Sequence, residues 1–264
     1  MCTAIAIWNY CWDAAKVVPG IHVFADLGFE AVSLNPGQFH QGGSRVLPEV
    51  GKALLERGLA ATVHGRVGMA PDLMREMIDA IGESLRVFSL DSRKTEDSRG
   101  VLHDAGRIRS ALEELQELTS GTDIRLAVED FPLDREALEF FGEELGDVYR
   151  HRRTGILVDV GHMHIRMRNS DYFSEMSVEE YFRRLPLTPV EVHLHDNDGR
   201  RDQHGHFGFG DVPFGEVAAA LAAIDFGGIS TIEIAPGFHG STPEDSRPEA
   251  ERSLREWRRL NGEV

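Results

Sequence analysis

Short apolar runs recur along the chain, and each is followed by a segment in which apolar side chains return every three or four residues. Eight of these runs have the length and composition of buried strands. They are residues 3–8, 29–35, 59–65, 85–91, 124–130, 155–161, 190–196 and 229–235. Because the runs are apolar almost throughout, they are typical of parallel strands that are covered on both faces.

Helical periodicity fills segments between these strands. In 103–119 the residues Ile108, Leu112 and Leu115 lie on one apolar stripe, and 214–224 has the same pattern. In the segment before the second strand, we expect Pro19 and Gly20 to interrupt the first helix. Eight strand–helix units in 264 residues predict an α/β protein, a closed (β/α)8 TIM barrel that forms a single domain over 1–264.

The composition limits the classes of binding partner and the cellular compartment that we expect. Acidic residues number 44 and basic residues 28, so the net charge of −16 repels phosphate backbones and no nucleic-acid partner is expected. The two cysteines, Cys2 and Cys11, have no C-x-x-C spacing, which favours a reducing cytoplasm over a disulfide framework or a thiolate zinc site. We find no signal-peptide pattern and no apolar stretch of about 18 residues, so no membrane contact is expected.

Polar residues stand at the carboxyl ends of several predicted strands, where a barrel of this type places its chemistry. Four of them, on successive strands, are Glu129, Asp159, His193 and Glu233. A buried charge without a partner is costly, so four together indicate one shared partner. Carboxylates plus an imidazole suit one divalent metal, namely Mn²⁺, Mg²⁺, Co²⁺ or Zn²⁺. The alternative is a set of ion pairs with Arg and Lys inside the barrel.

The segment "VHLHDNDGRRDQHGHFGFGD" (192–211) is rich in histidine and aspartate. His193 and His195 are two apart on a strand and therefore point to the same face. We expect His195 to contact substrate or orient a ligand, or else to be a solvated loop histidine. Arg200 is either a contact for a phosphate or acidic sugar, or a solvated charge. Turn-forming or supporting roles are expected for the glycines and remaining polar residues, Gly208, Gly210, Asp196, Asp198 and His206.

Four local patterns resemble the xylose isomerase-like superfamily, which includes sugar isomerases and epimerases and zinc-dependent AP endonucleases. They are "LAVEDF", "VDVGHMH", the 192–210 segment and "TIEI". The resemblance implies that Glu129 and Asp159 are metal ligands. It also implies that His162, Asp202 and His204 frame the substrate or hold a second metal. The chain departs from many of the sugar enzymes at Asp130 and Phe131.

The resemblance favours an isomerase or epimerase acting on a sugar or related hydroxy-carbonyl compound. Glu129 and Glu233 would bind the metal and also transfer protons through an enediolate intermediate. The expected substrate contacts are His64, His162, His195, His204 and Arg200. The segment 167–185 is expected to be a lid or an oligomer contact, which leaves a homo-oligomer open.

Two other functions remain open. A zinc-dependent AP endonuclease-like phosphodiesterase would need histidines at the ends of the third and fourth strands. His64 fits the first position, but the fourth strand ends in "VFSLDSR", where Asp91 would have to substitute. A barrel that binds a metal or ligand without catalysis is the third alternative.

Overall fold

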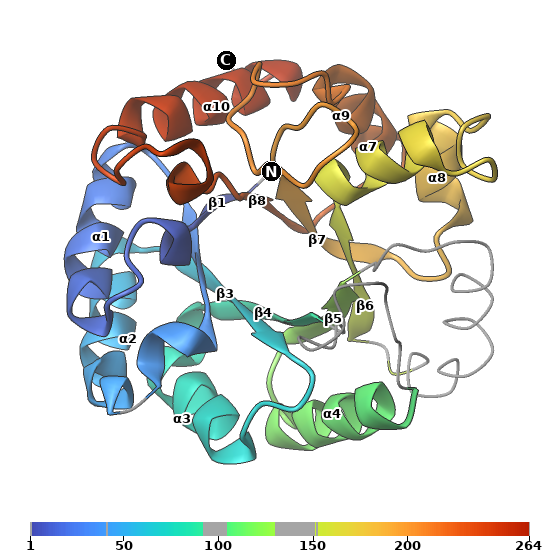
Figure 1. Cartoon of the computed structure of the whole chain (residues 1–264). Helices are drawn as coiled ribbons and strands as arrows, with labels where there is room; N and C mark the ends of the chain where they lie inside the picture. The colour runs from blue at the N-terminus through green and yellow to red at the C-terminus, as the bar shows by residue number, and fades with distance from the viewer. Residues whose placement is uncertain (1, 41, 92–104, 130–150, 152, 264) are drawn as a thin grey trace.

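Eight parallel strands close into a barrel in the computed structural model, which describes residues 2–40, 42–91, 105–129, 151 and 153–263. Each strand pairs in parallel with its neighbours in chain order, and β1 pairs with β8 to complete the ring (Figure 1). The prediction of a (β/α)8 barrel is therefore confirmed. The strands are β1 (Cys2–Ala6), β2 (Ala31–Leu34), β3 (Ala60–Arg66), β4 (Leu85–Asp91), β5 (Arg125–Glu129), β6 (Thr154–Asp159), β7 (Pro189–Leu194) and β8 (Ile229–Ile232).

Helices form a ring around the outside of the barrel (Figure 1). Those at 103–119 and 214–224, which the sequence predicts, are α4 and α9. Each turns its buried apolar stripe toward the sheet. The described helices are α1 (Ala14–Asp26), α2 (Leu47–Arg57), α3 (Pro71–Ile81), α4 (Ala105–Leu118), α7 (Val160–Asn169), α8 (Val178–Arg184), α9 (Phe214–Ala223) and α10 (Arg247–Leu260).

The first helix differs from the sequence prediction, because α1 continues through Pro19 and Gly20. Asp13 caps its start by accepting a hydrogen bond from the backbone N–H of Ala15 at 3.0 Å. The helix buries an apolar face that includes Ile21, and this packing offsets the backbone hydrogen bond that proline cannot donate. The predicted break was wrong because a local rule was outweighed by burial.

The side chains inside the barrel change from apolar to polar along the barrel axis. Toward the amino-terminal ends of the strands, it holds a cluster of mostly small apolar side chains that includes Ala4, Ala31 and Ala127. Farther along, buried polar side chains replace them, among them Ser33, Thr62, Ser89, Glu191 and Thr231. The carboxyl ends of the strands thus open onto a polar interior, which is where the candidate site lies.

The segment 167–185 contains the end of α7 and the whole of α8. Ser177 caps α8 through its hydroxyl, which accepts from the backbone N–H of Glu180 at 3.1 Å. Phe173 and Tyr181 are buried, so the segment packs against the fold. Its role as a lid or oligomer contact stays a prediction. Across the described ranges, no helix has both the length and the apolar character that a membrane crossing requires.

Candidate active site

Three of the four predicted metal ligands meet at the carboxyl ends of β6, β7 and β8. Asp159 ends β6, His193 lies in β7 and Glu233 follows β8 directly. Ligand atoms of the three lie within 4.8 Å of one another. His193 Nδ1 is 2.8 Å from Glu233 Oε2. All three side chains are buried, so the fold brings these charged groups together away from solvent.

Glu129, the fourth predicted ligand, adjoins this group at the end of β5. Its Oε1 lies 3.2 Å from His162 Nδ1, and its Oε2 lies 3.6 Å from His64 Nε2. His162 Nδ1 is in turn 3.7 Å from Asp159 Oδ1. Glu129 is therefore connected to the Asp159 group through His162. Acids and imidazoles alternate in this way around the barrel mouth, and we call this series the acid–imidazole chain; its members are Glu129, His162, Asp159, His195, Asp202, His204, Glu233 and His193.

A second cluster surrounds Asp202, in the loop after β7. One carboxylate oxygen lies 3.0 Å from His162 Nε2, and the other lies 3.1 Å from His204 Nε2. His204 has a positive φ of 46°, an uncommon conformation for a residue other than glycine. Such strain is found most often where a side chain must be aimed at a functional site. The three residues suggested for a second metal are thus neighbours.

His195 is fully buried beside Asp159. Its Nε2 lies 3.0 Å from Asp159 Oδ1 and 3.6 Å from Asp202 Oδ1. The alternative of a solvated loop histidine is therefore wrong. Gly161 makes this position possible, because a Cβ there would lie 2.0 Å from Cε1 of the His195 ring.

The rest of the loop after β7 is organised by Asp196. Its buried carboxylate accepts hydrogen bonds from the backbone N–H groups of Asn197, Gly208 and Val212 at 2.9–3.0 Å. Gly208 has a φ of 85°, as a tight turn requires. A Cβ on Gly210 would lie 2.0 Å from the carbonyl oxygen of Asn197. The predicted turn-forming roles of Asp196 and the two glycines fit this geometry.

Two further loop residues lie away from the buried clusters. Arg200 is exposed, and its backbone N–H donates to Asp198 Oδ1 at 2.9 Å. His206 Nε2 lies 3.5 Å from Glu249 Oε1, outside the acid–imidazole chain. A substrate contact by Arg200 stays a prediction.

The acids and imidazoles of the site shift one another's pKa values. Burial works against the charge on Glu233, but His193 and His204 lower the pKa of its carboxyl to about 2. Burial likewise opposes protonation of His204, yet Glu233 and Asp202 raise its pKa to about 9. The pKa of His193 is raised well above its ordinary value by Glu233 and Glu191 against the effect of burial. Without a metal, the acids therefore hold protons on His193 and His204.

Sequence reasoning missed Glu191, which lies in β7 and is fully buried inside the barrel. Thr62 Oγ1 and Thr231 Oγ1 each lie 2.8 Å from its Oε1, and His193 Nε2 lies 3.5 Å away. The available signal was the alternation Glu191, His193, His195, which puts three polar side chains on one face of an otherwise apolar strand.

A cavity of about 340 Å³ opens beside His64 at the barrel mouth. Trp12 is 59% exposed and lines this cavity, whereas Trp8 is buried and stacks on His64 with ring centroids 5.8 Å apart. Phe39 is buried, and Phe131 lies outside the described residues. The cavity is also lined by Asn35, Pro36, Gly37, His40, Gly65, Arg66, Met69 and Asp91.

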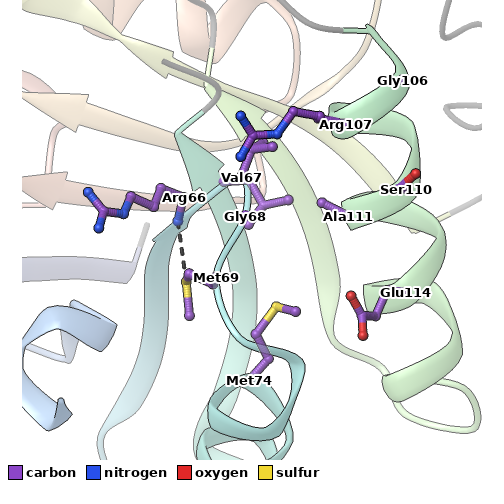
Figure 2. A pocket seen from close by; sticks show the side chains of 11 residues that line it. Arg66, Val67, Gly68, Met69, Met74, Gly106, Arg107, Ser110, Ala111 and Glu114 are labelled. Atoms are coloured by element: carbon purple, nitrogen blue, oxygen red, sulfur yellow. Dashed lines mark hydrogen bonds between the residues drawn. The ribbon is translucent and has the colours of Figure 1, made fainter. Parts of the chain in front are cut away.

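A neighbouring cavity lies between the loop after β3 and α4. Figure 2 shows Arg66, Met69 and Met74 on one side and Arg107 and Glu114 of α4 on the other. The backbone N–H of Arg66 donates to the Met69 sulfur at 3.3 Å. The described residues that line this cavity include no histidine, so we place the chemistry at the acid–imidazole chain instead.

The donor set fits a divalent ion. Asp159, His193 and Glu233 offer carboxylate oxygen and imidazole nitrogen, which suit Zn²⁺, Mn²⁺ or Co²⁺. Two carboxylates buried this close together need positive charge nearby, and their described ion-pair partners are imidazoles rather than Arg or Lys. These three residues, with Glu129 alongside, could therefore hold one metal.

Comparison with known proteins agrees with this architecture. The family described as "Xylose isomerase-like TIM barrel" matches residues 21–260. The uncharacterized protein MJ1311 of Methanocaldococcus jannaschii is 27% identical over 127 residues. That match covers 47% of this chain and 41% of the length of the relative.

Solved structures share the fold across nearly the whole chain. A D-psicose 3-epimerase solved in the presence of D-fructose has a TM-score of 0.73 at 17% identity, covering 99% of this chain and 100% of the other. The IolI protein with a bound zinc atom has a TM-score of 0.71 at 12% identity, covering 98% and 99%. Endonuclease IV from Thermus thermophilus has a TM-score of 0.59 at 16% identity, covering 100% of both chains.

Proposed function

The chain belongs to the xylose isomerase-like TIM barrel family, and from its site we propose a metal-dependent isomerase or epimerase of a sugar or related hydroxy-carbonyl compound. The observation that carries the proposal is the placement of two buried carboxylates. Glu129 ends β5 and Glu233 follows β8, on either side of Asp159 and His193. The likeness in fold to a D-psicose 3-epimerase supports the same reaction class.

Asp159, His193 and Glu233 would hold the ion, with Glu129 as the adjoining ligand. A divalent ion held there would polarise the substrate carbonyl and so acidify the neighbouring C–H bond. One glutamate would take that proton, the C–H electron pair would form a C=C bond, and the carbonyl π pair would move onto its oxygen to give an enediolate. Return of a proton to the same carbon from the other side would give an epimer. Return to the neighbouring carbon, with the hydroxyl proton passing to the former carbonyl oxygen, would give an isomer.

Other residues around the site would bind and orient the substrate. The cavity beside His64 is large enough for a small sugar. Its lining mixes polar groups such as Asn35 with the exposed ring of Trp12, and both kinds of surface suit a hydroxylated ring. We assign His64, His162, His195 and His204 to contacts with substrate or ligands.

The test is turnover of a panel of ketoses and hydroxy acids in D₂O by protein carrying one equivalent of metal. We expect deuterium at the carbon next to the carbonyl. Glu129→Gln and Glu233→Gln each keep an oxygen donor and remove the base, so turnover should fall roughly a hundredfold or more. Glu56→Gln, at an exposed site on α2, is the matched control and should leave turnover unchanged.

Two results would count against the proposal. Near-normal turnover by both active-site variants would reject the two glutamates as the bases. A confirmed substrate that turns over without taking up deuterium would instead indicate a hydride shift or a shielded proton.

A phosphodiesterase of the AP endonuclease type is a second candidate, because several potential ligand groups adjoin one another in the described part of the chain. Besides Asp159–His193–Glu233, these groups are Asp159–His162–His195, His195–Asp202–His204 and His64–Asp91–Glu129. The net charge of −16 opposes DNA binding. We expect no efficient nicking of an abasic duplex. Rapid, metal-dependent nicking that is lost in Glu129→Ala would support the phosphodiesterase instead. Metal binding without turnover of any substrate would support the third alternative, a barrel that binds a metal or ligand without catalysis.

A further inference from the structure

We propose that Glu191 positions His193, by holding its ring so that Nε2–H points into the barrel and the Nδ1 lone pair faces Asp159 and Glu233. Glu191 lies two residues before His193 on β7 and is fully buried. The proposed reaction does not use it. Its role rests on the proposed metal site but on no particular substrate.

The two nitrogens of His193 face different acids. Nδ1 lies 2.8 Å from Glu233 Oε2, on the side of the ligand group. Nε2 lies 3.5 Å from Glu191 Oε1 and has no hydrogen-bond partner among the described residues. When Nδ1 binds a metal, the neutral ring carries its proton on Nε2. Glu191 is the described carboxylate toward which that proton points.

The hydroxyl groups around Glu191 fix the direction of the hydrogen bonds. Thr62 Oγ1 lies 2.8 Å from Glu191 Oε1 and 2.6 Å from Ser33 Oγ. An ionised carboxylate can only accept, so Thr62 uses its single proton on Glu191 and must accept from Ser33. Thr231 also donates to Oε1, at 2.8 Å. Hydroxyls from β3 and β8 therefore anchor one carboxylate oxygen, and the Ser33 hydroxyl from β2 holds Thr62 in place.

The second oxygen of Glu191 shows that these hydroxyls do not complete the site. Oε2 is buried and has no hydrogen-bond partner among the described residues. A fully buried carboxylate is expensive to keep unless a nearby positive or strongly donating group compensates it. The described donor that approaches this carboxylate is the imidazole of His193, whose Nε2 lies 3.5 Å from Oε1, and a proton on Nε2 would supply the compensation. A carboxylate that accepts from a ligating histidine fixes its tautomer and raises its basicity, and removing it typically weakens metal binding 10- to 100-fold.

The test measures metal binding directly. Metal-free wild type and Glu191→Gln are titrated with Zn²⁺ and Co²⁺ by calorimetry, and the Co²⁺ complexes are compared by visible absorption. Glu191→Gln nearly keeps the volume but removes the charge, so we expect the dissociation constant to rise roughly 10- to 100-fold. Glu191→Asp keeps the charge and should restore part of the loss. Thr231→Val keeps the carboxylate and removes one anchor, so its effect should be smaller.

The tautomer is read from the wild type alone, which protects the test against a variant that does not fold. In zinc-loaded protein labelled with ¹⁵N-histidine, we expect His193 to carry its proton on Nε2 and the metal shift on Nδ1. The reverse assignment would overturn the proposal. So would unchanged metal affinity in a folded Glu191→Gln protein.

The outcomes separate this inference from the proposed function. If metal binding follows the expected pattern but no sugar turns over, the role of Glu191 stands and the proposed reaction fails. If the wild type turns over a sugar and Glu191→Gln binds metal normally, the reverse holds. A wild type that binds no metal would overturn both.

Discussion

At the scale of single residues, Gly161 determines where His195 can lie. A Cβ at position 161 would approach Cε1 of the His195 ring to 2.0 Å, far inside any real contact. The ring occupies that space, and its Nε2 lies 3.0 Å from Asp159 Oδ1. A residue without a side chain thus lets the imidazole reach a candidate metal ligand.

Gly161→Ala should therefore displace His195 and release Asp159 from its contact. We expect metal affinity to fall about tenfold or more, as it does when a partner that orients a ligand is lost. The matched control is Gly227→Ala, because a Cβ at Gly227 has nothing within 4 Å. Calorimetric titration of both variants with Zn²⁺ checks the prediction. Equal affinity in the two variants would contradict it.

The sequence was informative about site residues that end strands and less so about those inside the barrel. Asp159, His193 and Glu233 stand out because acids and imidazoles interrupt apolar runs at regular intervals. Glu191 interrupts the same run, yet its meaning depends on Thr62 and Thr231, which lie on other strands. Only the register of the closed sheet brings these residues together.

At the scale of elements, the loop after β7 is held by one buried carboxylate. Asp196 accepts three backbone N–H groups, and the loop also pairs with itself between Asp196 and Gly205. Asp202 and His204 lie within the span that these contacts close. The position of the second cluster therefore depends on Asp196, although that residue contacts neither of its histidines in the described hydrogen bonds.

Asp196→Ala should destabilise the protein by about 2–4 kcal/mol, because it leaves buried N–H groups without their charged acceptor. Asp198→Ala is the matched control. Asp198 is exposed and accepts from the backbone of Arg200, so its loss should cost about 0.5 kcal/mol or less. Urea unfolding of both variants measures the difference. A cost for Asp196→Ala as small as the control would show that solvent replaces the carboxylate.

The strands were predictable and α1 was not, for a physical reason. A buried parallel strand leaves a continuous apolar run whose ends shift by only a few residues in the structure. Pro19 carries a local signal for a break, but the decision depends on what the helix packs against. Val17, Ile21 and Phe24 are buried in the hydrophobic core, and that burial keeps the helix intact.

At the scale of the whole molecule, the chain of acids and imidazoles couples stability to pH. The pKa of His204 is raised from an ordinary value of 6.5 to about 9, and that of His162 is also raised well above 6.5, although burial opposes both shifts. A raised pKa means that the folded state holds the proton more tightly than the unfolded state. The stabilisation is complete below about pH 6.5 and is lost as the pH rises toward about 9.

Metal-free protein should therefore lose stability between pH 6.5 and 9, by an amount on the order of a few kcal/mol. Metal-loaded protein should lose less, because a bound ion supplies the positive charge that the protons otherwise provide. Thermal unfolding across this range, with and without chelator, tests the prediction. His204→Gln should flatten the metal-free profile. If the unfolding temperature of the metal-free wild type stayed constant or rose from pH 6.5 to 9, the prediction would be wrong.

Because the closed ring of strands assembles the candidate metal ligands, the folded fraction of the protein in a cell would depend on the metal ion. Glu129 and Glu233 are 104 residues apart in the sequence (233 − 129), and the paired strands β5 to β8 bring their neighbourhoods together. In an unfolded chain these donors are dispersed, so an ion held by them would bind the native state selectively. Scarcity of that ion would increase the fraction of chains open to proteases. The supply of that ion would then control the amount of the protein in the cell as well as its activity.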